Sequence, residues 1–201
     1  MEDKETELLI YSYLPLEEIL TLFKDDIETR DKIIKRYFKN LPDINDASAN
    51  GELETIKYLV SLGALSDDNT LYNAGKNGNL ELVKYIISLY LIPDKNFLDF
   101  VSENGNLEVV EYLIDLGIDP DIETLDWGAE SGNLELVAYL ISFGLEPNKN
   151  TLNVASISEN LEMVKYLISL GVEPDKNTLD YAVGNLEVVK YLIDLGIKPD
   201  I

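Results

Sequence analysis

Apolar residues recur along most of the chain at intervals of three and four residues, which is the period of an amphipathic α-helix. This helical pattern is itself repeated, because one phrase of the form Gly-Asn-Leu-Glu-x-Val-x-Tyr-Leu returns six times with small changes. A fixed period predicts a repeat array rather than one central core. The first leucine of the phrase falls, at intervals of 27, 27, 27, 27 and 25 residues, at Leu53, Leu80, Leu107, Leu134, Leu161 and Leu186.

Each unit is predicted to contain two helices joined by a glycine turn. In residues 120–147, Asp121 can cap the first helix with its carboxylate, and Thr124 follows three residues later. Gly132 ends that helix, because glycine takes a left-handed conformation without a Cβ clash. The second helix is predicted over about residues 133–143, where apolar residues fall on one face.

In four of the units the second helix is predicted to stop at a Gly-apolar-x-Pro motif. Glycine suits the position just after a helix, and a proline shortly afterwards prevents the helix from continuing. No segment shows the alternating pattern of a β-strand, so the chain is predicted to be all-α. The motif occurs at residues 117–120, 144–147, 171–174 and 196–199.

Three units depart from the pattern. Tyr90 replaces the glycine after a second helix, which predicts a distorted connector because a bulky residue is unfavourable at positive φ. Glu159 replaces the glycine between two helices. The last unit lacks two residues between Ala182 and Gly184, which predicts a shorter first helix.

Residues 1–42 lie outside the repeats and are predicted to form an N-terminal helical cap. Residues 14–23 and about 26–40 each have the composition of a helix. A cap is expected because the end of a repeat array otherwise leaves an apolar face open to water.

The composition makes the array strongly acidic. The chain has 16 basic and 38 acidic side chains, a net charge of −22, and a pI near 4.1. Residues 1–42 carry −3 of this charge and the repeats carry −19. This disfavours nucleic acid and anionic membranes as partners, because a polyanion is bound by Lys and Arg. With no signal-peptide pattern and no apolar run of about 20 residues, we expect a cytoplasmic protein.

The residue types present leave little room for catalysis. The chain has no cysteine and no histidine, which excludes thiol nucleophiles, imidazole bases and zinc sites built from these residues. It has no glycine-rich phosphate loop and no calcium loop. Paired acids such as Asp119 and Asp121 recur in the connectors, where helix capping and solvation account for them. We therefore expect no enzyme activity, cofactor, metal or small-molecule substrate.

Six of the twelve tyrosines share one repeat position. A stacked tyrosine row could bind a ligand. We expect instead that each ring packs between neighbouring repeats, because residues that contact a partner tend to vary between repeats. These residues are Tyr58, Tyr85, Tyr112, Tyr139, Tyr166 and Tyr191.

The repeated phrase resembles the second half of an ankyrin repeat, and Thr124-Leu125-Asp126 stands where that family opens its first helix with Thr-Pro-Leu-His. The period is 27 residues rather than about 33, and the missing residues come from the segment that forms a β-hairpin finger. Units this short resemble arrays in giant-virus and protist proteins. The resemblance implies a right-handed helical-repeat solenoid without fingers. Its six repeats are 43–69, 70–96, 97–123, 124–150, 151–177 and 178–201.

An ankyrin-like array implies a non-catalytic protein–protein interaction scaffold that binds through its first-helix face. Residues four apart on these helices form a stripe with an acidic middle, where Ile122 and Ile157 would be exposed anchors. The predicted partner is therefore a protein with a basic, partly apolar surface. Phe100 and Trp127, which directly follow Asp99 and Asp126, are predicted to belong to the core. The candidate partner-binding residues are Tyr72, Lys76, Asp99, Glu103, Ile122, Asp126, Glu130, Asn153, Ile157 and Asp180.

Two other functions stay open. Residues 14–23 resemble the opening of an F-box, which would make the chain a substrate adaptor of a ubiquitin ligase. However, the segment of about 28 residues from Leu14 to Leu41 is short for a complete three-helix F-box. The absence of Cys and His also fits a purely structural or engineered scaffold.

Overall fold

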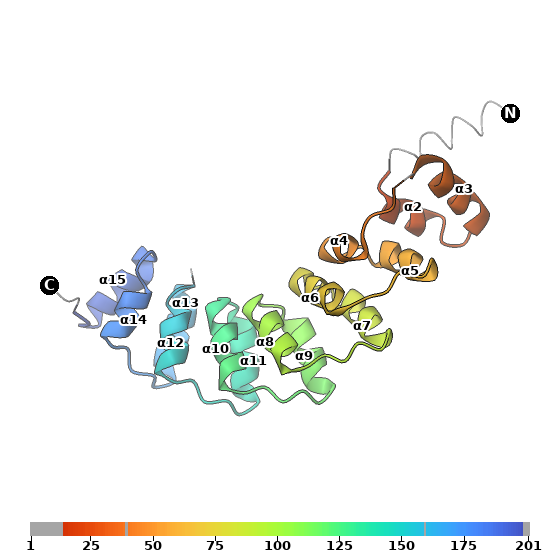
Figure 1. Cartoon of the computed structure of the whole chain (residues 1–201). Helices are drawn as coiled ribbons and strands as arrows, with labels where there is room; N and C mark the ends of the chain where they lie inside the picture. The colour runs from red at the N-terminus through yellow and green to blue at the C-terminus, as the bar shows by residue number, and fades with distance from the viewer. Residues whose placement is uncertain (1–13, 39, 159, 199–201) are drawn as a thin grey trace. The chain divides into compact units, whose positions relative to one another are not determined.

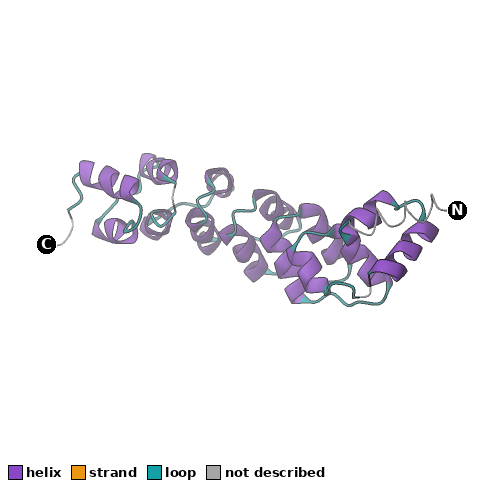
Figure 2. Cartoon of the chain, turned by 90° about the horizontal axis from the view of Figure 1, so that it is seen from above, coloured by secondary structure: helices purple, strands orange, loops and turns teal. Residues whose placement is uncertain are grey.

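The structure, a computed structural model, describes residues 14–38, 40–158 and 160–198. Within these residues the chain forms 14 α-helices and no β-strand (Figure 2), which confirms the all-α prediction. Two compact units divide the chain, Met1–Leu91 and Ile92–Ile201. None of the described helices is long and apolar enough to cross a lipid bilayer.

The first unit contains six of these helices (Figure 1). They pack as neighbours along the chain, with α2 against α3 and α5, and α4 against α5 and α6. The helices are α2 (Leu16–Leu22), α3 (Ile27–Tyr37), α4 (Ile44–Ala49), α5 (Leu53–Ser61), α6 (Asp68–Asn77) and α7 (Leu80–Ser88).

The N-terminal helices α2 and α3 lie where the sequence predicts two helices, and α2 packs against α5. Their buried side chains form one apolar cluster, against which Tyr58 of α5 packs. The Glu17 carboxylate accepts hydrogen bonds from the backbone N–H groups of Glu54 (3.0 Å) and Thr55 (2.6 Å). These are free amides in the first turn of α5, so a residue of α2 caps a helix of the array.

The second unit is a row of four helix pairs. The first helices of successive pairs pack side by side in the order α8, α10, α12, α14, and a second helix packs against each of α8, α10 and α12 (Figure 1). The eight helices are α8 (Lys95–Glu103), α9 (Leu107–Asp115), α10 (Ile122–Glu130), α11 (Leu134–Ser142), α12 (Lys149–Ala155), α13 (Leu161–Ser169), α14 (Lys176–Tyr181) and α15 (Leu186–Asp194).

The first helices begin at the capping residues that the sequence predicts. The Asp121 carboxylate accepts from the N–H groups of Glu123 (3.0 Å) and Thr124 (3.2 Å), while the Thr124 hydroxyl accepts from the N–H of Asp121. This reciprocal capping box satisfies amides that the helix itself cannot. The same box opens α6, α12 and α14.

The glycine-asparagine turn between the two helices of a unit also links successive units. Gly132 is left-handed, with φ 75°, as the sequence predicts. Asn133 caps α11 by accepting from the N–H of Leu136, and its side-chain amide donates to the carbonyl of Gly105 in the preceding unit at 2.7 Å. Asn160 repeats this link with Gly132 at 2.9 Å. The turn asparagine therefore caps the second helix of its own unit and also links that unit to the preceding one.

The connector after each second helix is a tight turn without a β-hairpin finger. At Gly117 (φ 92°) the N–H donates to the carbonyl of Ile114, and the N–H of Ile118 donates to that of Leu113. Tyr90 adopts the same left-handed conformation, with φ 74°. The predicted distortion is therefore wrong: the chain keeps the turn and forces a tyrosine into it.

The last unit has the shorter first helix that the sequence predicts, since α14 has 6 residues and α8 and α10 have 9 each. Glu159, which replaces a turn glycine, lies outside the described residues.

Candidate functional site

The first helices are joined by a row of buried threonine hydroxyls. In the second unit, the hydroxyl of Thr124 donates to Asp99 of the preceding repeat at 2.8 Å, and that of Thr151 donates to Asp126 at 2.6 Å. Thr178 donates to the side-chain oxygen of Asn153 at 2.8 Å. All three threonines are buried, so each hydroxyl group depends on its bond to the preceding repeat.

Asp99, Asp126 and Asn153 are three of the residues predicted to contact a partner, and the threonine row gives each of them a structural role as well. Asp99 is further engaged, because Lys95 binds its carboxylate at 2.7 Å and reaches Asp121 at 2.8 Å. The Asp126 carboxylate also accepts from the side-chain amide of Asn150 at 2.5 Å. The acidic stripe expected from the sequence is thus partly used within the array.

Other candidate residues of the second unit stand at the surface. Glu103 and Asp180 are exposed, and the side chains of Ile122 and Ile157 are 37% and 48% exposed. Glu130, at the last position of α10, is half-buried.

In the first unit, Lys76 on α6 is exposed and Tyr72 is half-buried. These two candidates are described within that unit alone.

The prediction that Trp127 belongs to the core is wrong. Its side chain is 39% exposed on α10, while Phe100 at the equivalent position of α8 is half-buried. Trp127 follows buried Leu125 by two residues on a helix, which turns it away from the face that packs on the neighbouring repeats.

Trp127 is one member of an apolar row on the first helices of the second unit. The same register position holds Phe100, Trp127, Val154 and Tyr181, at intervals of 27 residues, and Tyr181 is 46% exposed. In the first unit this position holds Asn73, whose side-chain amide donates to the backbone carbonyl of Asn45. The prediction that Phe100 and Trp127 belong to the core missed this row, although the shared register of the four residues is visible in the sequence.

A shallow hollow of about 330 Å³ lies beside Trp127 between α10 and α12. It is lined by Glu123, Asp126, Trp127 and Glu130 of α10 and by Asn150 and Val154 of α12. The four α10 residues are spaced at i, i+3, i+4 and i+7, which places them on one face of the helix. The hollow therefore combines an aromatic surface with three carboxyl groups.

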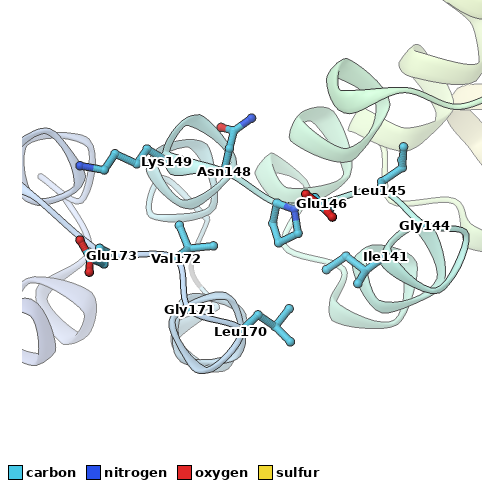
Figure 3. Close-up of a pocket in the computed structure, with 11 residues that line it drawn as sticks. Ile141, Gly144, Leu145, Glu146, Asn148, Lys149, Leu170, Gly171, Val172 and Glu173 are labelled. Carbon is cyan, nitrogen blue, oxygen red and sulfur yellow. The ribbon is translucent and has the colours of Figure 1, made fainter.

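A larger hollow of about 780 Å³ lies at the connectors of the same unit (Figure 3). Ile141 of α11 and Leu170, at the end of α13, point toward each other across it, and Glu146 and Glu173 stand on the two connectors. Its walls are the short turns that replace hairpin fingers.

The six equivalent tyrosines are all half-buried, as expected for rings packed between repeats. Cationic side chains cover three of the rings: Arg30 over Tyr58 at 5.5 Å, and Lys57 over Tyr85 and Lys165 over Tyr191, both at 5.9 Å. At these three positions the cation adds a favourable contact to the packing of the ring.

The pKa values of the capping residues Asp67 and Asp121 are lowered, which favours their ionised forms. The hydrogen bond from the N–H of Thr70 lowers the pKa of Asp67 below its ordinary value of 3.8. Burial acts to raise the pKa of Asp121, but hydrogen bonds from Lys95 and from the N–H of Thr124 outweigh it and the pKa is lowered. Both pKa shifts follow from hydrogen bonds, including those that cap a helix, so they have a structural cause.

Among the described residues, no group of three or more His, Cys, Asp or Glu side chains is arranged to hold a metal ion. The F-box-like residues of the N-terminal segment are occupied in packing, since Leu16, Ile19 and Leu20 are buried in the α2–α3 cluster.

Comparisons with known proteins agree with this geometry. The family model for ankyrin repeats (3 copies) matches residues 44–124 and 125–201. No curated protein sequence matches the chain. Solved structures of 191 chains match, and one is the ankyrin repeat domain of human ASB11, at a TM-score of 0.56 and 19% identity over 78% of this chain and 85% of that one. At this identity the likeness concerns the fold.

Proposed function

The chain belongs to the ankyrin-repeat family, and from this premise we propose that it is a non-catalytic scaffold that binds a partner protein through its first-helix face. Ankyrin repeats are protein–protein interaction modules. The observation that carries the choice of face is the apolar row of Phe100, Trp127, Val154 and Tyr181 in the second unit, two of whose side chains are well exposed. Aromatic side chains at a surface supply much of the binding energy of protein interfaces.

The side chains around the row define the partner that fits. Glu103, Glu130 and Asp180 add negative charge to the same first helices, and Ile122 and Ile157 add exposed apolar side chains. A basic, partly apolar protein surface would match both properties. Asp99, Asp126 and Asn153 accept hydrogen bonds from the threonine row, which holds neighbouring first helices together. In the first unit the candidate residues are Tyr72 and Lys76.

The mechanism of such a scaffold is presentation of a preformed surface. Helix caps, threonine bonds and asparagine links hold the first helices in place before any partner arrives. Little conformational entropy is then lost on association, which favours binding.

We further propose that residues 1–42 cap the array rather than recruit a ubiquitin ligase. The burial of Leu16, Ile19 and Leu20 and the use of Glu17 on α5 support this role. Deletion of residues 1–42 would then expose apolar surface and lower stability. Loss of a bound ligase adaptor with no change in stability would instead favour the F-box alternative.

The test is a crosslinked pull-down with mass spectrometry from lysate of the native host. Three charge reversals on the first-helix face, Glu103→Lys, Glu130→Lys and Asp180→Lys, should remove the partner. The matched control reverses three exposed acids elsewhere in the second unit, Asp115→Lys, Glu146→Lys and Asp194→Lys, and should retain it. Equal loss in both variants would contradict a specific face, and no enriched partner for the wild type would favour the structural scaffold.

A further inference from the structure

The hollow beside Trp127 has an uncompensated negative charge. Its lining contains three carboxyl groups and no Lys or Arg. Asp126 is satisfied by Thr151 and Asn150, whereas neither Glu123 nor Glu130 forms an ion pair within the part of the chain that the structure describes.

This contrasts with glutamates on the second helices. Glu54, Glu81 and Glu162 each pair with the lysine three residues later, at 2.6, 3.1 and 2.7 Å. The position three residues after Glu123 holds Asp126 instead, so α10 places like charges together where α5, α7 and α13 place an ion pair. Like charges on neighbouring turns destabilise a helix, and a cation bound between them would remove that cost.

Trp127 gives the hollow an aromatic surface in addition to its carboxyl groups. It is the only tryptophan of the chain, and it lines the hollow together with Val154 rather than packing fully into the core. The indole ring is the aromatic surface that attracts a cation most strongly, and a neighbouring carboxylate adds to the attraction. A metal ion is a poor occupant, since these carboxyl groups are not arranged as a metal-binding group.

We infer that the Trp127 hollow is a binding site for an arginine side chain of a partner protein. The planar guanidinium would lie against the indole ring, donate to the Glu123 and Glu130 carboxylates, and place its methylene groups against Val154. Arginine fits better than lysine because its flat, weakly hydrated cation both stacks on an aromatic ring and binds carboxylates with two parallel bonds. This inference rests on the proposed function and specifies its partner.

The experiment uses the full chain and the indole N–H resonance of Trp127, which is unique because the chain has one tryptophan. The probe is a blocked tetrapeptide, acetyl-Ala-Arg-Leu-Ala-amide. Its control contains citrulline, which keeps the planar shape but has no charge. The arginine peptide should shift the resonance in a saturable way, and the citrulline peptide should bind about tenfold more weakly. Equal shifts with both peptides, or no shift with either, would overturn the inference.

The double substitution Glu123→Gln and Glu130→Gln should weaken the binding of the arginine peptide by about tenfold. The matched control, Glu108→Gln and Glu135→Gln, changes two exposed acids on α9 and α11 and should leave the affinity unchanged. Similar weakening by both variants would show that general charge, not this hollow, attracts the peptide.

The outcomes also separate this inference from the proposed function. If the arginine peptide does not bind but partner capture still depends on Glu103, Glu130 and Asp180, the arginine site is wrong and the first-helix face stands. If the peptide binds at Trp127 but the charge-reversed variant still captures its partner, the hollow binds arginine, the captured partner uses another surface, and the proposed face is wrong.

Discussion

At the scale of single residues, the position of one hydroxyl decides whether a polar side chain stabilises the array or weakens it. Thr151 and Thr55 are both fully buried near the start of a helix. The hydroxyl of Thr151 bonds Asp126 and completes a capping box, whereas that of Thr55 has no hydrogen-bond partner among the described residues. A buried polar group stabilises a fold only when it is bonded.

The two threonines should therefore respond in opposite ways to the same substitution. Thr151→Val should lower the free energy of unfolding by about 1–2 kcal/mol, because it removes the bond to Asp126. Thr55→Val should raise it by up to about 1 kcal/mol, because it removes an unsatisfied hydroxyl and keeps the shape. Urea unfolding followed by circular dichroism measures both, and a loss of stability in Thr55→Val would contradict the assignment.

Tyr90 carries backbone strain that glycine would relieve. Its φ of 74° is unfavourable for a residue with a Cβ, and its side chain is 96% exposed, so little packing is lost on removal. Tyr90→Gly should raise the free energy of unfolding by about 0.5–1 kcal/mol, measured by thermal unfolding.

The control is Gly117→Ala, at an equivalent turn with φ 92°, where an added Cβ would meet no atom within 4 Å. It should lower stability by about 1 kcal/mol through the backbone alone. A neutral result at both positions would mean that the turns tolerate either residue.

At the scale of helices, most helices are capped by their own N-cap side chain, but α5 depends on a residue of another helix. Its N-cap residue, Glu52, makes no side-chain capping bond, and the Glu17 carboxylate of α2 takes that place. The N-terminal helices are thus joined to the array by charge-assisted bonds as well as by apolar packing.

Glu17→Ala should lower the free energy of unfolding by about 1–2 kcal/mol, because it leaves two amides of α5 without an acceptor. Amide hydrogen exchange should show faster exchange at Glu54 and Thr55. The neighbouring Glu18→Ala is the control, since Glu18 is exposed and should change stability little. Identical effects of the two substitutions would argue against capping.

At the scale of the whole molecule, the charge of −22 is largely uncompensated. The chain has 38 acidic side chains and only 16 basic ones, so most of the negative charge has no positive charge to offset it. Repulsion among like charges must therefore outweigh attraction between opposite ones, and this opposes folding. Salt should stabilise the protein by screening that repulsion.

Raising sodium chloride from about 0.02 M to about 0.3 M should raise the free energy of unfolding by about 1 kcal/mol, because the screening length falls severalfold. The variant with Asp115→Lys, Glu146→Lys and Asp194→Lys has a net charge of −16 and should gain less from salt. Thermal unfolding across a salt series tests this, and a decrease in stability with salt would mean that the ion pairs dominate.

The sequence alone determined the features that depend on local chemistry and period. Capping residues such as Asp121 and turn glycines such as Gly132 specify where helices begin and end, and the fixed period specifies a helical repeat array. The tertiary structure decided which side of a residue meets another repeat. In the folded chain Trp127 lies at the surface. Asp99 and Asp126 accept hydrogen bonds from the threonine row, and Glu17 accepts from the backbone of α5. Those contacts join residues 24 to 38 positions apart, and no local pattern encodes where two such side chains meet.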